Sequence, residues 1–132
     1  MTTITPEPLQ VAQAAFQDYA AGLSTGEWQA FLDHLSDDFT FWFPAGPFKG
    51  MNQGKDKVAA FLSAVPKVFP GGLTLTVLQI TSNETTVVFE VRSQGRMGTE
   101  PYENQAAIAF EVRGDKITSY REYLGVVFQL GQ

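Results

Sequence analysis

The segment Tyr102-Glu-Asn-Gln-Ala-Ala-Ile-Ala-Phe-Glu-Val-Arg113 alternates between two kinds of side chain. One set of alternate positions is apolar apart from Asn104 and the Tyr102 hydroxyl, and it comprises Tyr102, Asn104, Ala106, Ile108, Phe110 and Val112. The other set includes Glu103, Gln105, Glu111 and Arg113. Because successive side chains of a strand point to opposite faces, the segment is predicted to be a strand with Asn104 on its core side.

Three further strands are predicted around this segment, over Leu73–Thr81, Thr86–Ser93 and Lys116–Phe128. All three are rich in β-branched and aromatic residues, which favour strands. Turn residues separate them at Ser82-Asn-Glu84, Gly95–Pro101 and Gly114-Asp115. The second half of the chain is therefore predicted to be an antiparallel meander of four strands.

Two helices are predicted near the N-terminus. Apolar residues recur at steps of three and four from Leu9 to Leu23, and Pro6 and Pro8 suit the opening turn. Ser24-Thr-Gly-Glu27 matches a capping box, and Trp28, Phe31, Leu32 and Leu35 follow at helical spacing. A second helix is therefore expected directly after the first.

A short strand and a third helix complete the first half. Phe39–Phe43 has strand character and ends at Pro44, and the following stretch 45–50 is expected to be irregular. Val58–Val65 has helical spacing and is expected to end at Pro66. Helices followed by strands indicate an α+β fold, with the helices gathered on one face of a curved sheet.

Composition narrows the classes of function. The chain has 132 residues, 44% of them hydrophobic, and a net charge of −5, without a linker or repeat, so residues 1–132 are expected to form one domain. Its nine Lys and Arg residues are dispersed, which disfavours nucleic acid and membrane partners. Met1-Thr-Thr-Ile-Thr-Pro6 lacks the features of a signal peptide, so a cytoplasmic location is expected.

The residue inventory also limits the chemistry. There is no cysteine and one histidine, His34, which lies off the apolar stripe of its helix and is expected on the surface. Neither a metal site nor a serine triad is expected. Any catalysis must rest on Asp, Glu, Tyr, Arg or Lys, without a cofactor.

Several motifs carry a resemblance to a known superfamily. The segment Gln17–Glu27, then Leu35-Ser-Asp-Asp-Phe-Thr40 and Pro44-Ala-Gly46, resembles the opening of the nuclear-transport-factor-2-like (NTF2-like) superfamily, which includes SnoaL-like proteins and ketosteroid isomerases. The ending Gly114–Tyr123 is similar to the last strand of limonene-epoxide hydrolases of that superfamily. The resemblance implies a cone of three helices and a curved, mainly antiparallel sheet around a deep pocket, frequently as a dimer.

Only some of the functional residues of ketosteroid isomerases have a counterpart in this chain. Tyr19 falls where ketosteroid isomerases place a tyrosine that donates a hydrogen bond to an oxyanion. Their general base, an Asp before the proline of the first strand, corresponds here to Phe43. Their second donor is replaced by Ala107 or Ile108. The resemblance therefore implies a pocket for a flat apolar ligand without the known isomerase chemistry.

The hydrolase resemblance points to Glu122. Epoxide hydrolases of the superfamily carry an Arg-Asp-Tyr segment, which Arg121-Glu122-Tyr123 resembles. Their Arg-x-Asp step corresponds to Glu90-Val-Arg92 in reverse order. A Glu90–Arg92–Glu122 cluster is one arrangement, and a surface or dimer-interface pair of Glu90 and Arg92 is the other, because Val87, Phe89 and Val91 form the apolar face of that strand.

Candidate pocket residues follow from these faces and resemblances. We expect ligand contacts from Tyr19, Trp42, Phe43, Phe61, Glu90, Asn104, Ile108 and Glu122, with Glu122 and Tyr19 as the catalytic candidates. Trp42 and Phe43 could equally be core, and Asn104 could bond neighbouring groups instead. Glu122 shares a face with Tyr120 and Leu124, so it is expected to bond Asn104 or Tyr19, to pair with an arginine such as Arg92, or to be protonated. The alternative is that Glu122 pairs with an arginine on the dimer side of the sheet and only fixes the register.

Three functions remain open at this point. The first is binding of a small, largely apolar molecule with acid–base chemistry of the isomerase, cyclase or hydrolase type. The second is a carrier or sensor that only binds, and the third is an interaction domain that uses the sheet. A homodimer is expected through the outer sheet face, because apolar residues occupy both odd and even positions of the strands and would therefore lie on both faces. Examples are Leu75 and Val77 against Leu78 and Ile80, and Tyr123 and Val127 beside Val126 and Phe128.

Overall fold

A computed structural model describes residues 7–125 of the chain. Its elements in chain order are α1 (Pro8–Thr25), α2 (Gln29–Leu32), β1 (Leu35–Phe43), the 3-10 turn η1 (Gly46–Phe48), β2 (Gly50–Gln53), α3 (Lys55–Val68), β3 (Leu73–Ser82), β4 (Thr86–Met97), β5 (Glu100–Arg113) and β6 (Lys116–Gly125). Pro6 and residues 126–128, which entered the predictions of α1 and of the last strand, lie outside this range. No helix within residues 7–125 is both long and apolar enough to cross a bilayer.

The six strands form one sheet in the order β2-β1-β6-β5-β4-β3. The pairs β3–β4, β4–β5 and β5–β6 are antiparallel, which confirms the predicted meander. The first strand extends the sheet by pairing parallel to β6, and β2 adds an antiparallel edge. The predicted α+β class with a mainly antiparallel sheet and three α-helices is confirmed.

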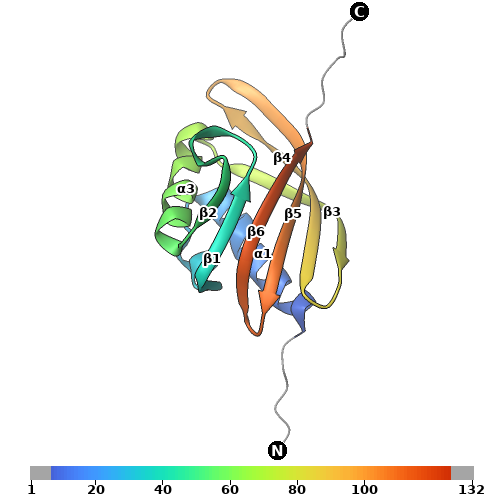
Figure 1. Ribbon diagram of the computed structural model, residues 1–132. Coiled ribbons are helices and arrows are strands. Elements are labelled where there is room, and N and C mark those ends of the chain that lie inside the picture. The colour runs from blue at the N-terminus through green and yellow to red at the C-terminus, as the bar shows by residue number, and fades with distance from the viewer. Residues whose placement is uncertain (1–6, 126–132) are drawn as a thin grey trace, which may run out of the picture.

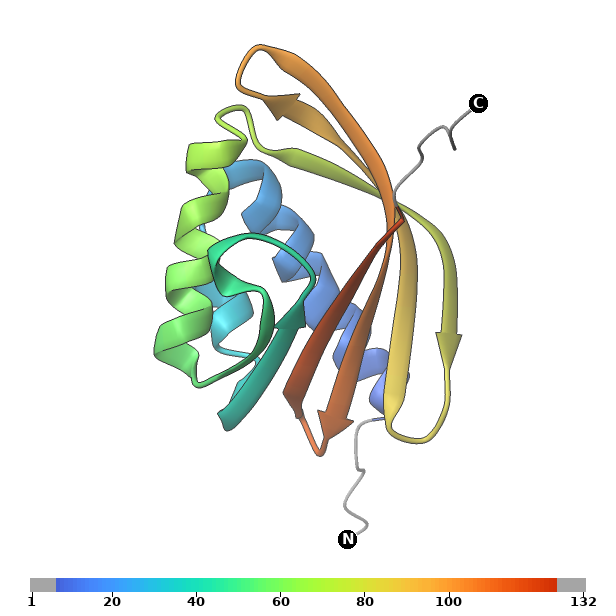
Figure 2. The ribbon, with the colours of Figure 1, turned by 45° about the horizontal axis from the view of Figure 1, so that its top comes forward.

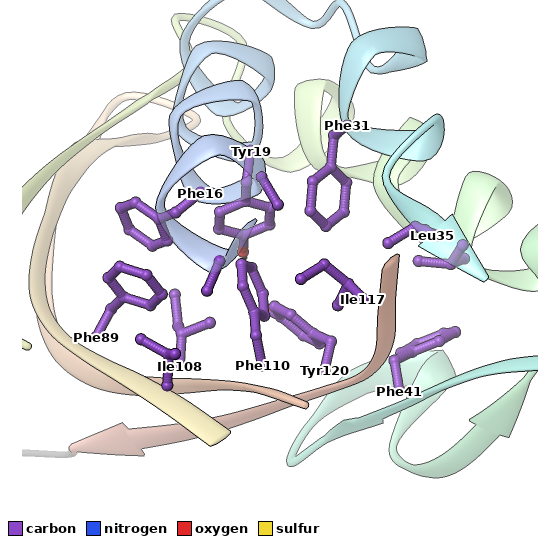
Figure 3. Close-up of a cluster of buried hydrophobic side chains, with 14 of the residues drawn as sticks. Phe16, Tyr19, Phe31, Leu35, Phe41, Phe89, Ile108, Phe110, Ile117 and Tyr120 are labelled. Atoms are coloured by element: carbon purple, nitrogen blue, oxygen red, sulfur yellow. The ribbon is translucent and has the colours of Figure 1, made fainter. Parts of the chain in front are cut away.

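The sheet curves around the helices (Figures 1 and 2). Helix α1 crosses its concave face, and α3 lies beside β1 and β2. Between these layers is a core in which Phe16 of α1 stacks on Phe89 of β4, with ring centroids 4.2 Å apart. Figure 3 shows this cluster of buried side chains, with rings from both the helices and the sheet. Each such side chain stabilises the fold by about 1.5–3 kcal/mol through burial.

The second helix differs from the prediction. It spans only the four residues Gln29–Leu32, and no side chain caps its start. The hydroxyls of Ser24 and Thr25, assigned to a capping box, instead donate to the Ala21 carbonyl within the last turn of α1. Gly26 ends that helix in the left-handed region, with φ of 83°, so the segment is a helix stop. Leu35, assigned to the second helix, begins β1.

Other boundaries also differ. Helix α3 includes Pro66, which was expected to end it, because a proline in the last turn removes a single hydrogen bond from the helix. The stretch expected to be irregular contains η1 and the short strand β2. Strands β4 and β5 continue through the predicted turn, so their hairpin closes at Gly98 with φ of 65°.

The apolar residues of β3 are divided between the two faces of the sheet differently from the sequence prediction. The register shifts between Val77 and Gln79, where the strand bulges. Beyond the bulge, Ile80 pairs with Phe89, so it returns to the face that Leu75 occupies opposite Ser93. Leu78 lies at the bulge and is exposed. Leu78 therefore lies on the outer face as expected, whereas Ile80 does not.

Candidate functional site

A pocket of about 440 Å³ lies between the concave face of the sheet and the helices, a volume within the range of small-molecule sites. Its walls are mostly aliphatic and aromatic. The lining residues include Leu23, Phe43, Phe48, Phe61, Leu62, Val65, Phe69, Leu73, Leu75, Val91, Ala106, Ile108 and Leu124. Polar side chains among them are few and fall into two groups, one around Glu122 and one around Asn104.

Glu122 is brought to the pocket by the register of the sheet. It lies opposite Ile108 of β5, and Tyr120 lies opposite Phe110, so both side chains share the concave face. Tyr120 donates a hydrogen bond to Oε1 of Glu122. Tyr19 of α1 donates to the same oxygen over 3.4 Å and lies 2.9 Å from the Tyr120 hydroxyl. In Figure 3, Tyr19 and Tyr120 approach each other from α1 and β6.

Burial is the main cause of the pKa shifts of Glu122, Tyr19 and Tyr120. Desolvation raises the pKa of Glu122, and the hydrogen bonds from Tyr120 and Tyr19 lower it to a smaller extent. Burial and then the negative charge of Glu122 raise the pKa of both Tyr19 and Tyr120 well above that of free tyrosine. The tyrosines are therefore neutral donors, and Glu122 is the one carboxyl group among the described residues that line the pocket.

A second polar group lines the same pocket. Ser93 of β4 donates to Oδ1 of Asn104 over 2.9 Å, and Nδ2 of Asn104 donates to the Tyr102 hydroxyl. The ring of Tyr102 packs edge-on against Phe69, with centroids 4.8 Å apart. Asn104 therefore bonds neighbouring side chains, as one of its two expected arrangements required, while it also lines the pocket.

The structure brings six of the eight predicted residues to the pocket wall: Tyr19, Phe43, Phe61, Asn104, Ile108 and Glu122. Their roles as ligand contacts remain predictions. Trp42 was placed wrongly: it points to the convex face and packs on Tyr123, with ring centroids 5.2 Å apart. Because side chains alternate along β1, Phe43 and Trp42 cannot share a face, and Phe43 packs on Phe61 inside.

Glu90 lies on the outer face of β4, as one of its two expected arrangements required, and it does not line the pocket as a ligand contact would. It is exposed and lines a shallow depression on the convex face together with Leu78, Ala107 and Tyr123. Its neighbour Arg92 pairs with Glu103 over 3.4 Å. The Glu90–Arg92–Glu122 cluster therefore does not form, because buried Val91 and Phe89 occupy the inner face of β4.

Two further residues were missed or misjudged. Tyr120 is buried and donates to Glu122, yet it was not among the candidates, although its position two residues before Glu122 in a strand was a sufficient signal. His34 is only partly exposed and lies 2.7 Å from Asp18, so it is not the solvated residue that its helical position suggested. Neither His34 nor Asp18 lines the pocket.

Comparisons with known proteins agree with this geometry. Residues 16–120 match the SnoaL-like domain family. The fold is similar to that of an NTF2-like protein from Anabaena variabilis ATCC 29413, with 49% sequence identity, a TM-score of 0.90 and 96% of each chain covered. No curated protein sequence matches the chain.

More distant structures share the fold alone. A hypothetical protein with a ketosteroid isomerase-like fold from Catenulispora acidiphila DSM 44928, in complex with trimethylamine, is 19% identical with a TM-score of 0.71, covering 91% of this chain and 86% of that one. An LEH-like epoxide hydrolase from M. tuberculosis is 18% identical with a TM-score of 0.71 and the same coverage. The pocket is thus built on a scaffold that also holds enzymes.

Proposed function

The chain belongs to the SnoaL-like domain family, and we propose that it binds a small, largely apolar molecule in the pocket and exchanges a proton with it through Glu122. One observation carries the proposal: a carboxyl group lies inside a largely apolar cavity, and one of its oxygens accepts hydrogen bonds from two tyrosines. Burial raises the pKa of this carboxyl, and a carboxyl with a raised pKa in a cavity is a candidate to give and take a proton in acid–base chemistry.

Two proteins of similar fold support the two parts of this proposal, small-molecule binding and chemistry. The complex of the C. acidiphila protein with trimethylamine supports small-molecule binding by the scaffold, and the epoxide hydrolase supports chemistry on it. The reaction is of the isomerase, cyclase or hydrolase type and needs no cofactor. Phe43 in place of the isomerase base limits the pocket to the single carboxyl of Glu122, which must both remove and return the proton.

Binding is tested by blocking the pocket. Ala106 and Ala107 are neighbours on β5, and Ala106 lines the pocket while Ala107 faces the depression on the other side. Ala106→Phe should weaken binding of a neutral fluorescent probe, ethylnaphthalene, by about tenfold or more, because the added ring occupies the ligand volume. Ala107→Phe is the matched control and should leave the affinity unchanged. Equal affinity in wild type and a folded Ala106→Phe variant would contradict pocket binding.

Proton exchange is tested by searching for a small molecule that co-purifies with the protein. Native mass spectrometry of wild type and Glu122→Gln identifies the small molecule each retains. If Glu122 performs chemistry, the variant should retain substrate that the wild type converts, so the two bound molecules should differ. The same molecule in both proteins would instead favour the second candidate, a carrier or sensor. That candidate is also favoured by the pocket lining, because the described residues of the lining include a single carboxyl.

We also propose a homodimer through the convex face of the sheet. Tyr123, 48% exposed, and Leu78, 46% exposed, lie there with the partly exposed Trp42. An open aromatic and aliphatic surface of this kind is favoured at interfaces. Light scattering should give a dimer mass for wild type and a monomer mass for Tyr123→Glu, with Ala60→Glu on α3 as the control. A monomeric wild type at high concentration would contradict the proposal.

A further inference from the structure

The described lining of the pocket contains one acidic side chain and no basic side chain. Among the described residues that line it, Glu122 alone carries a formal charge. The neighbouring Arg121 points to the other face of the sheet, where it pairs with Glu111 over 3.1 Å. A buried carboxylate is costly unless a cation or several hydrogen bonds compensate it, and among residues 7–125 only two tyrosines donate to Glu122.

Those bonds leave one oxygen of Glu122 for a ligand. Tyr120 and Tyr19 both donate to Oε1. Within residues 7–125, no side chain or backbone group donates to Oε2, and Glu122 lines the cavity. An ionised carboxyl is an acceptor only. The group that complements Oε2 is therefore a hydrogen-bond donor, and a positively charged donor would also supply the missing countercharge.

The titratable groups that face Glu122 do not compete for this role. They are Tyr19 from α1, Tyr120 from β6 and Tyr102 from β5, and no charged residue of α3, β1 or β4 lines the pocket. After burial, the charge of Glu122 is the next cause that raises the pKa of Tyr102. The negative potential of Glu122 therefore extends along the pocket wall, and no described cationic side chain of the lining opposes it.

Aromatic rings of the wall suit a cation as well as an apolar body. Phe61 of α3 lies at the centre of a ring cluster, 4.8 Å from Phe43 and 5.5 Å from Phe48 by ring centroids. Tyr102 and Phe69 form a second pair. Cations are attracted to the faces of aromatic rings, most strongly where water is excluded. The remaining wall is aliphatic and favours a hydrocarbon body.

We propose that the ligand of this pocket is a lipophilic amine, whose protonated nitrogen donates a hydrogen bond to Oε2 of Glu122 while its apolar body lies among the aromatic rings. This assignment rests on the proposed function and narrows its ligand class. The proton balance is simple: when an ammonium ligand meets protonated Glu122, the carboxyl proton leaves to the solvent and a carboxylate–ammonium pair remains.

Three probes of similar size test this assignment. Naphthylmethylamine is cationic near neutral pH, ethylnaphthalene is its neutral isostere, and naphthylacetate is anionic. The wild-type protein should bind the amine about tenfold or more tightly than either other probe, since a desolvated ion pair with cation–π contacts is worth at least that factor. In Glu122→Gln the preference for the amine should disappear, while the affinity for ethylnaphthalene should change by about twofold or less. Glu111→Gln on the outer face should behave as wild type.

A second measurement needs no variant. Calorimetry of wild type with the amine, in buffers of different ionisation enthalpy, should detect proton release at a pH where Glu122 is protonated, and the affinity should rise with pH as Glu122 ionises. A ligand that accepted a bond from the protonated acid would show the opposite trend. This readout keeps the assignment testable even if Glu122→Gln does not fold.

The outcomes separate the two proposals. If the wild type binds ethylnaphthalene as tightly as the amine, or if the amine preference survives in a folded Glu122→Gln variant, the amine assignment is overturned while pocket binding stands. An affinity for the amine that falls as pH rises through the ionisation of Glu122 also overturns it. If none of the probes binds, both the amine assignment and the proposed pocket function are wrong.

Discussion

Glu122 on the concave face and Glu111 on the convex face are carboxylates on neighbouring strands with opposite surroundings. Glu111 is partly exposed, accepts hydrogen bonds from Thr86 over 2.9 Å and pairs with Arg121 over 3.1 Å. Glu122 accepts bonds from neutral tyrosines only. The carboxylate on the convex face is therefore satisfied by neighbouring side chains, whereas the one on the concave face is left with an open oxygen and a raised pKa.

This difference arises from the alternation of the strands. Arg121 and Glu122 are adjacent in β6, so they necessarily point to opposite faces. The arginine therefore reaches Glu111, and its charge is separated from Glu122 by the sheet. Three substitutions on the concave face therefore have a counterpart on the convex face, and a fourth, at Arg121, tests the convex ion pair itself.

Phe110→Ala should have the largest effect on stability. Phe110 is fully buried on the concave face and packs against Phe31, Phe89 and Tyr120. Its truncation should lower the free energy of unfolding by about 3–5 kcal/mol through lost burial and the resulting cavity. The neighbouring Glu111→Ala should lower it by about 1 kcal/mol or less. Urea titrations measure both values, and comparable losses would show that the two faces do not differ in packing as described.

Tyr120→Phe should have the next largest effect. The ring still fills its site, but Glu122 loses one of the two hydroxyl donors on its Oε1, so the free energy of unfolding should fall by about 1–3 kcal/mol. Its counterpart, Thr86→Val, removes a donor to Glu111, which retains Arg121 and access to water. Thermal or urea unfolding of the pair should give the larger loss for Tyr120→Phe; the reverse order would mean that the tyrosine bonds contribute little.

Glu122→Gln should change the pH dependence of stability. Burial raises the pKa of Glu122 in the folded protein, so the folded state keeps its proton to higher pH than the unfolded chain. The free energy of unfolding of wild type should therefore fall as pH rises from the ordinary pKa of glutamate through the raised one. The variant lacks this decline, so its relative stability should grow with pH over that interval.

Urea midpoints at a series of pH values, compared between wild type and Glu122→Gln, measure this effect. The two proteins should converge at pH below the ordinary pKa of glutamate. Glu111→Gln serves as the control, because it loses the charge facing Arg121 and is not expected to gain stability. A stability difference independent of pH would show that Glu122 has the same affinity for protons in both states.

Arg121→Gln should have the smallest effect. It breaks a partly exposed ion pair, whose contribution is about 0–1 kcal/mol and decreases with salt. Unfolding measured at low and at high ionic strength should show the difference from wild type shrinking as salt is added. A large loss of unfolding free energy that does not depend on salt would indicate that Arg121 stabilises the fold through packing of its side chain rather than through its ion pair with Glu111.

Local pattern was enough to predict much of this protein. The alternation along Tyr102–Arg113 and around Glu122 assigned Asn104, Ile108 and Glu122 to the inner face, because side-chain direction in a regular strand depends only on parity. The helical stripe that includes Tyr19 was identified for the same kind of reason. The order of helices and strands, and hence the α+β class, also follows from the spacing of apolar residues within short segments of the chain.

Only the tertiary structure decided what these side chains meet. Tyr19 reaches Glu122 across 103 residues of sequence, and the parallel pairing of β1 with β6 directs Trp42 to the convex face. The bulge near Leu78, the four-residue α2 and the isolation of Glu122 from Arg92 likewise depend on register and packing between distant segments. Local periodicity orients a side chain, but its partners, and therefore its pKa and chemistry, are set by contacts that no single stretch of sequence contains.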